Sequence, residues 1–279
     1  LKRTHNKAKK PLFRRLFLLL CYTYIVNKLS IGKCLRMNSM NRSVLMTTIQ
    51  KKVINLYELR YKPIFSEFTD SEFNLLRKNM YLRKYKKGQI LFDEGDIREK
   101  IFYLVDGLVR LEKYDESAFY TYTDYVKKET LFPYGGMFSD KVYHYSAYAL
   151  TDIELYYIPT TLFESLIEKN PKQMIFFYHK LSKILKSHEE RLQYLVVSNA
   201  TNRIIKALNY LMKELGDYSN PTMVNIPYPI TINEIANMSG CSRETVGNTI
   251  KKLKEREKLE YEHKLFVFKD LIYFNSYTE

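Results

Sequence analysis

The stretch that most constrains the fold of this chain is TINEIANMSGCSRETVGNTIKKLK, from Thr231 to Lys254. Its pattern predicts two short helices joined by a tight turn. Thr231 is a favourable N-cap, and Glu234 three residues later completes a capping box. Gly240 supplies the permissive backbone that a sharp turn needs, and Ser242 caps the second helix. The sequence therefore predicts a compact helical pair in this part of the chain.

The second of these helices is predicted to have one apolar and one polar face. Val246, Ile250 and Leu253 recur at i, i+4 and i+7, which places them on the buried side. The other face, at the helix N-terminus, is made by Arg243, Glu244, Gly247 and Asn248. A DNA-binding helix-turn-helix presents its base-reading side chains at this place. The alternative is a helical hairpin with ordinary solvated charges.

The run GCSRETVG, from Gly240 to Gly247, strongly resembles the recognition-helix entry of the cyclic-AMP receptor protein branch of the Crp/Fnr family of bacterial transcription regulators. The resemblance implies a cytoplasmic homodimer that binds double-stranded DNA and works with RNA polymerase. It implies a TGTGA-like inverted repeat, read by Arg243, Glu244, Gly247 and Asn248. Asn248 replaces a second base-reading arginine of the family. The residues expected to contact phosphate are Ser242, Thr245, Lys251 and Lys252.

Residues 81–158 have the pattern of an all-β domain. Short strands are predicted at 81–85, 89–92, 101–105, 108–111, 118–126 and within 145–158, with Gly88, Gly95 and Gly107 at turns. Short strands with Gly and Asp between them favour a barrel or jelly roll. The arrangement resembles the cyclic-nucleotide-binding domain of the same family. The predicted fold class is α+β: a cyclic-nucleotide-binding-like β-barrel (jelly roll), a long dimerisation helix and a C-terminal winged helix-turn-helix.

In that family, a short cassette between two strands holds the ligand phosphate, and the matching stretch here is LFPYGGMF at 131–138. The nucleotide-binding branch needs a carboxylate for the ribose hydroxyls and an arginine for the phosphate. Tyr134 stands near the carboxylate position, and His144 or Tyr145 near the arginine position. Because an unpaired buried phosphate is costly, we expect no cyclic AMP binding.

A candidate cassette for an unknown small-molecule effector remains, formed by Tyr134, Gly135, Gly136, His144 and Tyr145. Its LFP start without a ligand signature looks most like the Gram-positive branch of the family that regulates arginine deiminase pathway operons.

A long helix is predicted from Pro171 to about Val197, and it carries an apolar seam. The seam residues Phe177, Leu181, Ile184, His188, Leu192 and Leu195 follow the 4-3-4-4-3 spacing typical of a coiled coil. Such a seam usually packs against a partner, so we expect a dimer helix. The alternative is packing on its own barrel, and one edge of the helix is expected to do both.

The remaining C-terminal elements complete a winged domain. A hinge is expected at 198–201, where Asn199 is placed to cap the next helix, and Gly216 ends that helix. After the second helix of the pair, 259–261 and 265–268 are predicted to form a small hairpin, the wing. Its turn at 262–264 lacks the glycine common in the family.

Charge and cysteine content limit the other function classes. The formal net charge is +14, but 11 of the 45 Lys and Arg residues lie in 1–45, which contain no Asp or Glu. The rest holds 34 basic and 31 acidic residues, so the global charge says little about DNA binding. Residues 243–258, however, hold six Lys or Arg against three Glu, the footprint expected for phosphate contact.

We expect neither a metal, a cofactor nor an enzyme. The three cysteines, Cys21, Cys34 and Cys241, lack the spacing of a disulfide framework or a metal cluster. The five histidines form no zinc-ligand spacing. No nucleophile motif, paired carboxylates or phosphate loop is found.

Residues 1–45 combine a basic start with an apolar run of eleven, Leu16 to Val26. One alternative is a signal peptide, but no small-residue cleavage site follows the apolar run. Another is a membrane anchor, but that would need about 20 apolar residues. The late methionines favour an upstream in-frame translation or a dispensable extension, with no membrane association in the mature protein. The predicted domains are this extension at 1–45, a sensor domain at 46–171, the dimerisation helix and hinge at 172–199, and the DNA-binding domain at 200–279.

Two function classes remain. One is a homodimeric winged-helix transcription regulator with a ligand-sensing or vestigial barrel. The other is a cyclic-nucleotide-binding signalling module that acts through protein partners. The run 242–247 favours the first, and the missing Arg and Glu in the cassette count against the second. The sequence leaves open whether the regulator activates or represses.

Overall fold

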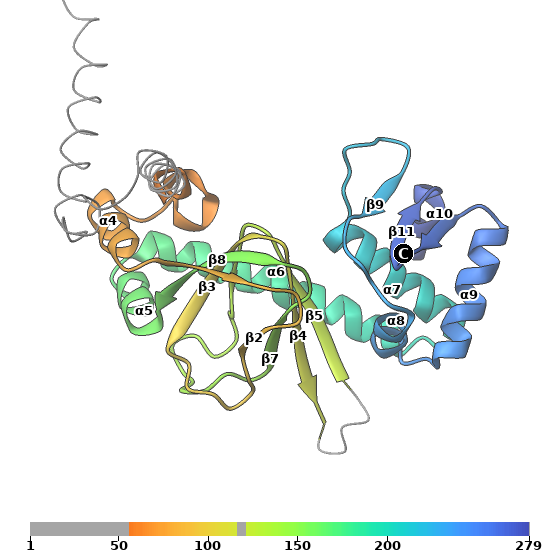
Figure 1. Cartoon of the computed structure of the whole chain (residues 1–279), viewed down its shortest axis with the longest axis horizontal. Helices are drawn as coiled ribbons and strands as arrows, with labels where there is room; N and C mark the ends of the chain where they lie inside the picture. The colour runs from red at the N-terminus through yellow and green to blue at the C-terminus, as the bar shows by residue number, and fades with distance from the viewer. Residues whose placement is uncertain (1–55, 116–120, 279) are drawn as a thin grey trace, which may run out of the picture. The chain divides into compact units, whose positions relative to one another are not determined.

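The computed structural model describes residues 56–115 and 121–278 (Figure 1). The chain divides into two compact units, Leu1–Arg60 and Tyr61–Glu279. The 3-10 helix η1 (Leu59–Tyr61) crosses this boundary, and every strand and helix from η2 (Pro63–Phe65) onward lies in the second unit. The predicted extension at 1–45 lies outside the described residues.

Two four-stranded antiparallel sheets form the predicted jelly roll (Figure 1). One has the order β1-β8-β3-β6, which are Tyr81–Tyr85, Ile153–Pro159, Lys100–Asp106 and Thr130–Phe132. The other has the order β2-β7-β4-β5, which are Ile90–Phe92, Ser146–Ala149, Leu108–Tyr114 and Thr121–Lys127. Apolar side chains of both sheets, among them Leu104 and Val109, meet in one buried cluster. The predicted strand region 145–158 is thus two strands that belong to different sheets.

Helices precede and follow the barrel. Before the barrel lies α4 (Asp70–Lys78), which begins at a capping box: Thr69 N donates to Glu72 Oε2 at 2.7 Å, and Thr69 Oγ1 accepts from Glu72 N at 3.3 Å. After the last barrel strand come α5 (Thr160–Glu168) and the long α6 (Pro171–Leu195). α6 ends two residues before the predicted limit, because Val196 is its C-cap.

The long helix α6 has a buried inner face. Phe177, which was expected in the dimer seam, is 1% exposed, and its ring packs edge to face on Phe163 with centroids 5.6 Å apart. Phe177 is therefore part of the core of its own chain. Ile184 and His188 are half-buried, and His188 Nδ1 lies 3.4 Å from the Tyr122 hydroxyl of β5. For these residues the sequence spacing did not show which neighbour the helix packs on.

The side of α6 next to this buried face carries exposed apolar side chains. Tyr178, Leu185 and Leu192 are 68%, 61% and 65% exposed. The other large apolar residues exposed on this helix are Ile175, Leu181 and Leu195. An isolated chain leaves this apolar stripe in contact with water, which is typical of a surface that binds a partner.

The C-terminal domain has its own core. It contains α7 (Ala200–Leu215), α8 (Ile232–Ser239), α9 (Arg243–Glu255), α10 (Leu271–Asn275), the 3-10 helix η3 (Ser276–Thr278) and a sheet of order β10-β11-β9, which are Leu259–Glu262, Leu265–Phe268 and Val224–Ile226. The predicted cap of α7 is confirmed, since Asn199 Oδ1 accepts from Asn202 N at 3.1 Å, and Gly216 is its C-cap. Leu208, Ile235, Val246 and Phe266 share one buried cluster.

The wing forms without a glycine. Strands β10 and β11 pair up to Glu262 and Leu265, which leaves a two-residue turn at His263 and Lys264. Both residues have positive φ angles, 51° and 69°. A two-residue turn with left-handed backbone at both positions matches the right-handed twist of a hairpin, so the geometry is that of a type I′ turn.

Candidate nucleic-acid interface

Local hydrogen bonds define both ends of the helix pair α8–α9. Thr231 N donates to Glu234 Oε2 at 2.6 Å, and Glu234 N donates to Thr231 Oγ1 at 3.2 Å, which is the predicted capping box. Gly240 ends α8 with a left-handed φ of 58°. Ser242 Oγ then accepts from Thr245 N at 3.1 Å and caps α9. The predicted turn and both caps are confirmed.

One side of α9 anchors the helix in the domain. Val246, Ile250 and Leu253 are buried, as the spacing predicted. Thr249 is buried beside them, where its hydroxyl donates to Thr245 O at 2.9 Å and so satisfies its own donor. Because this face is fixed by core packing, the opposite face has a defined orientation.

The opposite face of α9 is polar and open. Ser242, Arg243, Glu244, Asn248, Lys251 and Lys252 are exposed, while Thr245 and Gly247 are half-exposed. Arg243, Glu244, Asn248 and the two lysines form no salt bridge or side-chain hydrogen bond with other residues of the described ranges. The structure thus places the eight residues predicted to contact DNA at the start of α9 and on its exposed side. The side-chain groups of Arg243, Glu244, Asn248 and the two lysines are available, whereas the hydroxyls of Ser242 and Thr245 bond to each other at 2.8 Å.

Other basic residues near this face are used inside the domain. Lys254 Nζ donates to Tyr261 O of the wing at 3.3 Å, and Lys258 Nζ lies 2.6 Å from Asp270 Oδ2. These two lysines therefore connect α9 and the strand after it to neighbouring elements, whereas Lys251 and Lys252 remain available to an external anion.

The helix pair also contacts the barrel, through residues that the sequence did not single out together. Arg110 of β4 reaches α8, with its Nη1 3.4 Å from Glu234 Oε1, and its Nε lies 2.9 Å from Glu112 Oε1. Burial and the carboxylate of Glu234 raise the pKa of Tyr125 in β5. Leu108 of β4 belongs to the core cluster of the C-terminal domain. A sequence separation of 124 residues between Arg110 and Glu234 leaves no local signal for this contact.

The barrel interior is filled by aromatic rings. Phe92 stacks on Tyr143 with centroids 3.8 Å apart and on Phe102 at 5.6 Å, and Phe102 stacks on Phe132 at 5.4 Å. Tyr145, which stands near the family's arginine position, joins this stack with its centroid 6.3 Å from Phe92. These side chains occupy the interior between the two sheets.

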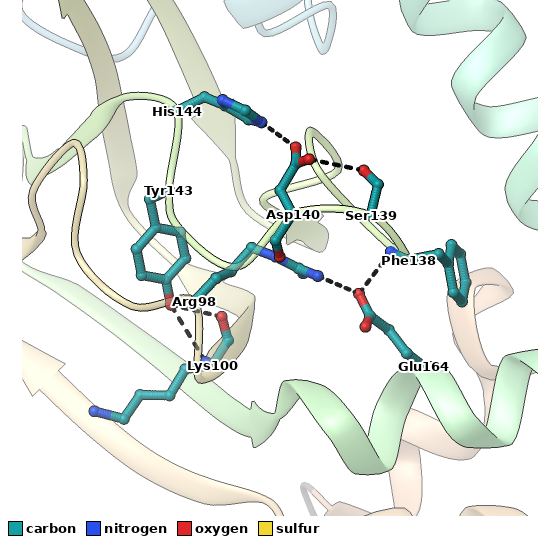
Figure 2. Close-up of polar contacts among 8 residues, drawn as sticks. All are labelled: Arg98, Lys100, Phe138, Ser139, Asp140, Tyr143, His144 and Glu164. Atoms are coloured by element: carbon teal, nitrogen blue, oxygen red, sulfur yellow. Dashed lines mark hydrogen bonds and ion pairs between the residues drawn. The ribbon is translucent and has the colours of Figure 1, made fainter.

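The candidate cassette is held by internal bonds (Figure 2). Arg98 Nη2 lies 2.5 Å from Glu164 Oε1 of α5, and the same oxygen accepts from Phe138 N at 3.0 Å. Arg98 Nε donates to Asp140 O at 3.1 Å. The His144 ring contacts the Asp140 carboxylate and holds the pKa of Asp140 below its usual value. Arg98 and His144 therefore already have internal partners.

The tyrosines of the cassette supply no charge. Burial raises the pKa of Tyr134 and of Tyr145 far above neutrality, so both phenols stay uncharged at physiological pH. Tyr134 packs on Phe177 of α6, with ring centroids 6.1 Å apart. Gly136 has a φ of 76°, and a side chain there would collide with Asp140. The structure groups the five predicted cassette residues in one loop region, between β6 and β7. Arg98 and Lys113 both reach this loop, but each is paired with a carboxylate, of Glu164 and Glu94 respectively.

Two further findings bear on other kinds of site. Within residues 56–115 and 121–278, no cluster of three His, Cys, Asp or Glu side chains is arranged to hold a metal ion. The helices of these same ranges also lack the combination of length and apolar character needed to cross a bilayer.

The fold and the exposed face of α9 define a class of protein: DNA-binding regulators with a winged helix-turn-helix joined to a cyclic-nucleotide-binding type of barrel. Residues 82–170 match the cyclic nucleotide-binding domain, and residues 202–271 match the Crp-like helix-turn-helix domain. The chain is 32% identical over 182 residues to the HTH-type transcriptional regulator ArcR of Staphylococcus epidermidis, which covers 65% of this chain and 78% of that protein. This chain belongs to the Crp/Fnr family of transcription regulators, as its sequence motifs predicted.

Other relatives agree. ArcR of Staphylococcus haemolyticus is 29% identical over 183 residues, covering 66% of this chain and 80% of that protein. Among solved structures, FixK2 from Bradyrhizobium japonicum has a TM-score of 0.61 at 16% identity, covering 71% of this chain and 96% of that one. The regulator CLP of Xanthomonas campestris has a TM-score of 0.60 at 22% identity, covering 72% and 100%. At such identities the structural likeness bears on the fold alone.

The first prediction concerns Gly247. A side-chain carbon at this position would meet nothing within 4 Å, so packing within the chain does not require glycine here. Gly247→Ala should raise the free energy of unfolding by about 0.5–1 kcal/mol, because glycine is the poorer helix former. Urea denaturation measures this change, and a fall in stability would contradict it. The same variant should bind DNA more weakly, because the methyl group would stand on the face that we expect to approach DNA.

The second prediction concerns cyclic AMP. Isothermal titration calorimetry of the full chain with cyclic AMP should give no binding heat, because aromatic rings pack between the two sheets and the cations that reach the cassette, Arg98 and Lys113, are already paired with carboxylates. Binding with a micromolar Kd would contradict this expectation.

Proposed function

We propose that this chain is a sequence-specific transcription regulator that binds an inverted repeat in double-stranded DNA as a homodimer. The observation that carries this proposal is the face of α9: polar, partly basic, fixed from behind by the domain core, and unpaired with the described residues of the chain. Such a face at a helix N-terminus suits the major groove. As a transcription regulator, the protein would act in the cytoplasm, where the DNA is, and would work together with RNA polymerase.

The side chains on this face suggest the half-site. Arg243, in the first turn of α9, can pair through its guanidinium fork with O6 and N7 of a guanine. Glu244 can accept from the N4 amino group of a cytosine on the other strand. We propose a TGTGA-like half-site, with the preference at the guanine of its GA step changed by Asn248. Ser242, Thr245, Lys251 and Lys252 contact phosphate in this proposal and position the helix.

The exposed stripe of α6 supports a homodimer. Tyr178, Leu185 and Leu192 recur every seven residues, and Leu181, His188 and Leu195 repeat with the same period three residues later. This is the a and d pattern of a two-stranded coiled coil. We therefore propose this stripe as the dimer seam. It keeps Leu181, Leu192 and Leu195 of the sequence-based set, and it has His188 at its edge, where the half-buried ring also contacts Tyr122 of the barrel. It omits Phe177 and Ile184, which face the chain's own barrel and core.

The relatives suggest which genes are controlled. The staphylococcal proteins are named ArcR, and we propose that this chain likewise controls arginine deiminase pathway or related anaerobic and carbon metabolism genes. A cyclic-nucleotide signalling module acting through protein partners is the weaker proposal, because the ring stack fills the barrel and α9 offers a DNA-reading face.

The third prediction separates base reading from phosphate contact. A binding-site selection with the full chain should return a dyad motif. Arg243→Ala should cost about 1–3 kcal/mol of binding free energy and relax the preference at one position of each half-site. Lys251→Ala should weaken all sequences alike and reduce the salt dependence of binding. A selection without a dyad, or one unchanged by Arg243→Ala, would contradict the assignment.

The fourth prediction concerns the dimer. Replacing Leu181 and Leu185 by Lys places two charges in the proposed seam, where desolvation of an unpaired charge is costly. Sedimentation should then show monomers with weaker binding to the dyad. Gln193→Lys is the control for each single charge added, because it places one positive charge at an exposed position of α6 next to the stripe. A dimer that survives the double substitution would assign dimerisation to another surface.

A further inference from the structure

Arg203, in the first turn of α7, forms an unusually complete set of hydrogen bonds. Its Nε donates to Ser239 O at 3.0 Å, its Nη1 to Val197 O at 2.8 Å and Ser198 O at 3.1 Å, and its Nη2 to Gly240 O and Cys241 Sγ, both at 3.4 Å. A guanidinium has five N–H donors in a fixed plane, so every donor of Arg203 has an acceptor.

The acceptors belong to two separate places in the chain. Val197 and Ser198 follow the end of α6 and form the hinge. The other three, at 239–241, form the turn between α8 and α9. A third contact lies at the same junction. Leu195 Cδ2 of α6 is 3.9 Å from the point where a Cβ on Gly240 would stand.

The charge of Arg203 suits this place. The backbone carbonyls after the last turn of a helix lack intrahelical partners and carry the negative end of the helix dipole. Arg203 bonds to such carbonyls near the ends of two helices, α6 and α8. A lysine keeps the charge but is a point donor without a planar fork, so it cannot hold five acceptors in one geometry.

We propose that Arg203 is a positioning residue that fixes the angle between the dimer helix and the recognition helix. It thereby sets the spacing between half-sites that the dimer accepts. The proposal rests on the dimeric DNA-binding function proposed above. The two recognition helices of a dimer must reach major grooves about 34 Å apart, so a small rotation at this junction changes the fit to both half-sites at once.

This role is separate from base reading. Within the described residues, the side-chain hydrogen bonds of Arg203 go to 197–198 and to the turn before α9, whereas base reading is proposed for the exposed face of α9. Loss of its bonds should therefore change which spacer the dimer prefers and leave unchanged which bases each half-site prefers.

The experiment uses the full chain with Arg203→Lys and, in parallel, Arg203→Gln. The probes are duplexes that carry the dyad selected by the unsubstituted protein, with its own spacer and with spacers one and two base pairs shorter and longer. Lys206→Gln is the matched control: Lys206 lies one turn further along α7 with its Nζ over the Tyr194 ring at 5.0 Å, and it makes no side-chain hydrogen bond to the turn in the described residues.

The unsubstituted protein and Lys206→Gln should show one sharp spacer optimum. Both Arg203 variants should lose about tenfold in affinity for the optimal spacer, relative to the other spacers, so that the preference flattens. The bases selected in each half-site should stay the same. The ratio of affinities between spacers does not depend on the folded fraction of a preparation. A variant that is less stable therefore still tests the proposal.

Two results would overturn the proposal in different ways. If the unsubstituted protein selects no dyad, the proposed function fails and the role of Arg203 fails with it. If it selects a dyad with a sharp spacer optimum, and both Arg203 variants keep that optimum or lose affinity equally for all spacers, only the positioning role is wrong.

Discussion

The structure depends on the long helix α6, which has two apolar surfaces that must both be removed from water. The inner face of α6 is closed by its own chain, where Phe177 packs on Phe163 and Tyr134. The outer face is equally apolar and stays exposed along Tyr178, Leu185 and Leu192. Pairing that stripe with a second copy removes it from water and, by symmetry, brings two helix-turn-helix units to one side of the assembly. Dimerisation and operator geometry would thus share one cause.

The sensor barrel keeps the shape of a nucleotide-binding domain with a different interior. Aromatic rings pack in the space between the two sheets, and the Arg98–Glu164 ion pair connects the cassette to α5. Glu164 accepts from the Arg98 guanidinium and from the Phe138 amide. Its carboxylate therefore supplies to the cassette a negative charge, as a ligand phosphate would. The barrel packs on the long helix through contacts of its own side chains, such as that between Tyr134 and Phe177.

Short-range rules predicted more of this structure than long-range ones. The caps at Thr231 and Ser242, the left-handed Gly240 and the two faces of α9 depend on residues a few positions apart, and the sequence displays them directly. The position of Phe177 was not predictable, because a 4-3 spacing identifies an apolar face without naming the surface that covers it. The acceptors of Arg203 lie up to 38 residues away and are mostly backbone atoms, which leave no trace in residue identity.

The two carboxylate oxygens of Glu234 have different partners. Oε2 accepts from Thr231 and completes the helix cap, while Oε1 faces Arg110 of the barrel at 3.4 Å. Arg110 in turn keeps a closer partner in Glu112, at 2.9 Å. If the helix pair separated from the barrel, the N-cap of α8 would therefore stay intact. Arg110 would keep Glu112 as its partner, and Glu234 would keep its bonds to Thr231. Loss of this contact would leave α8 folded, while the bonds of Arg203 would still hold the helix pair to the hinge.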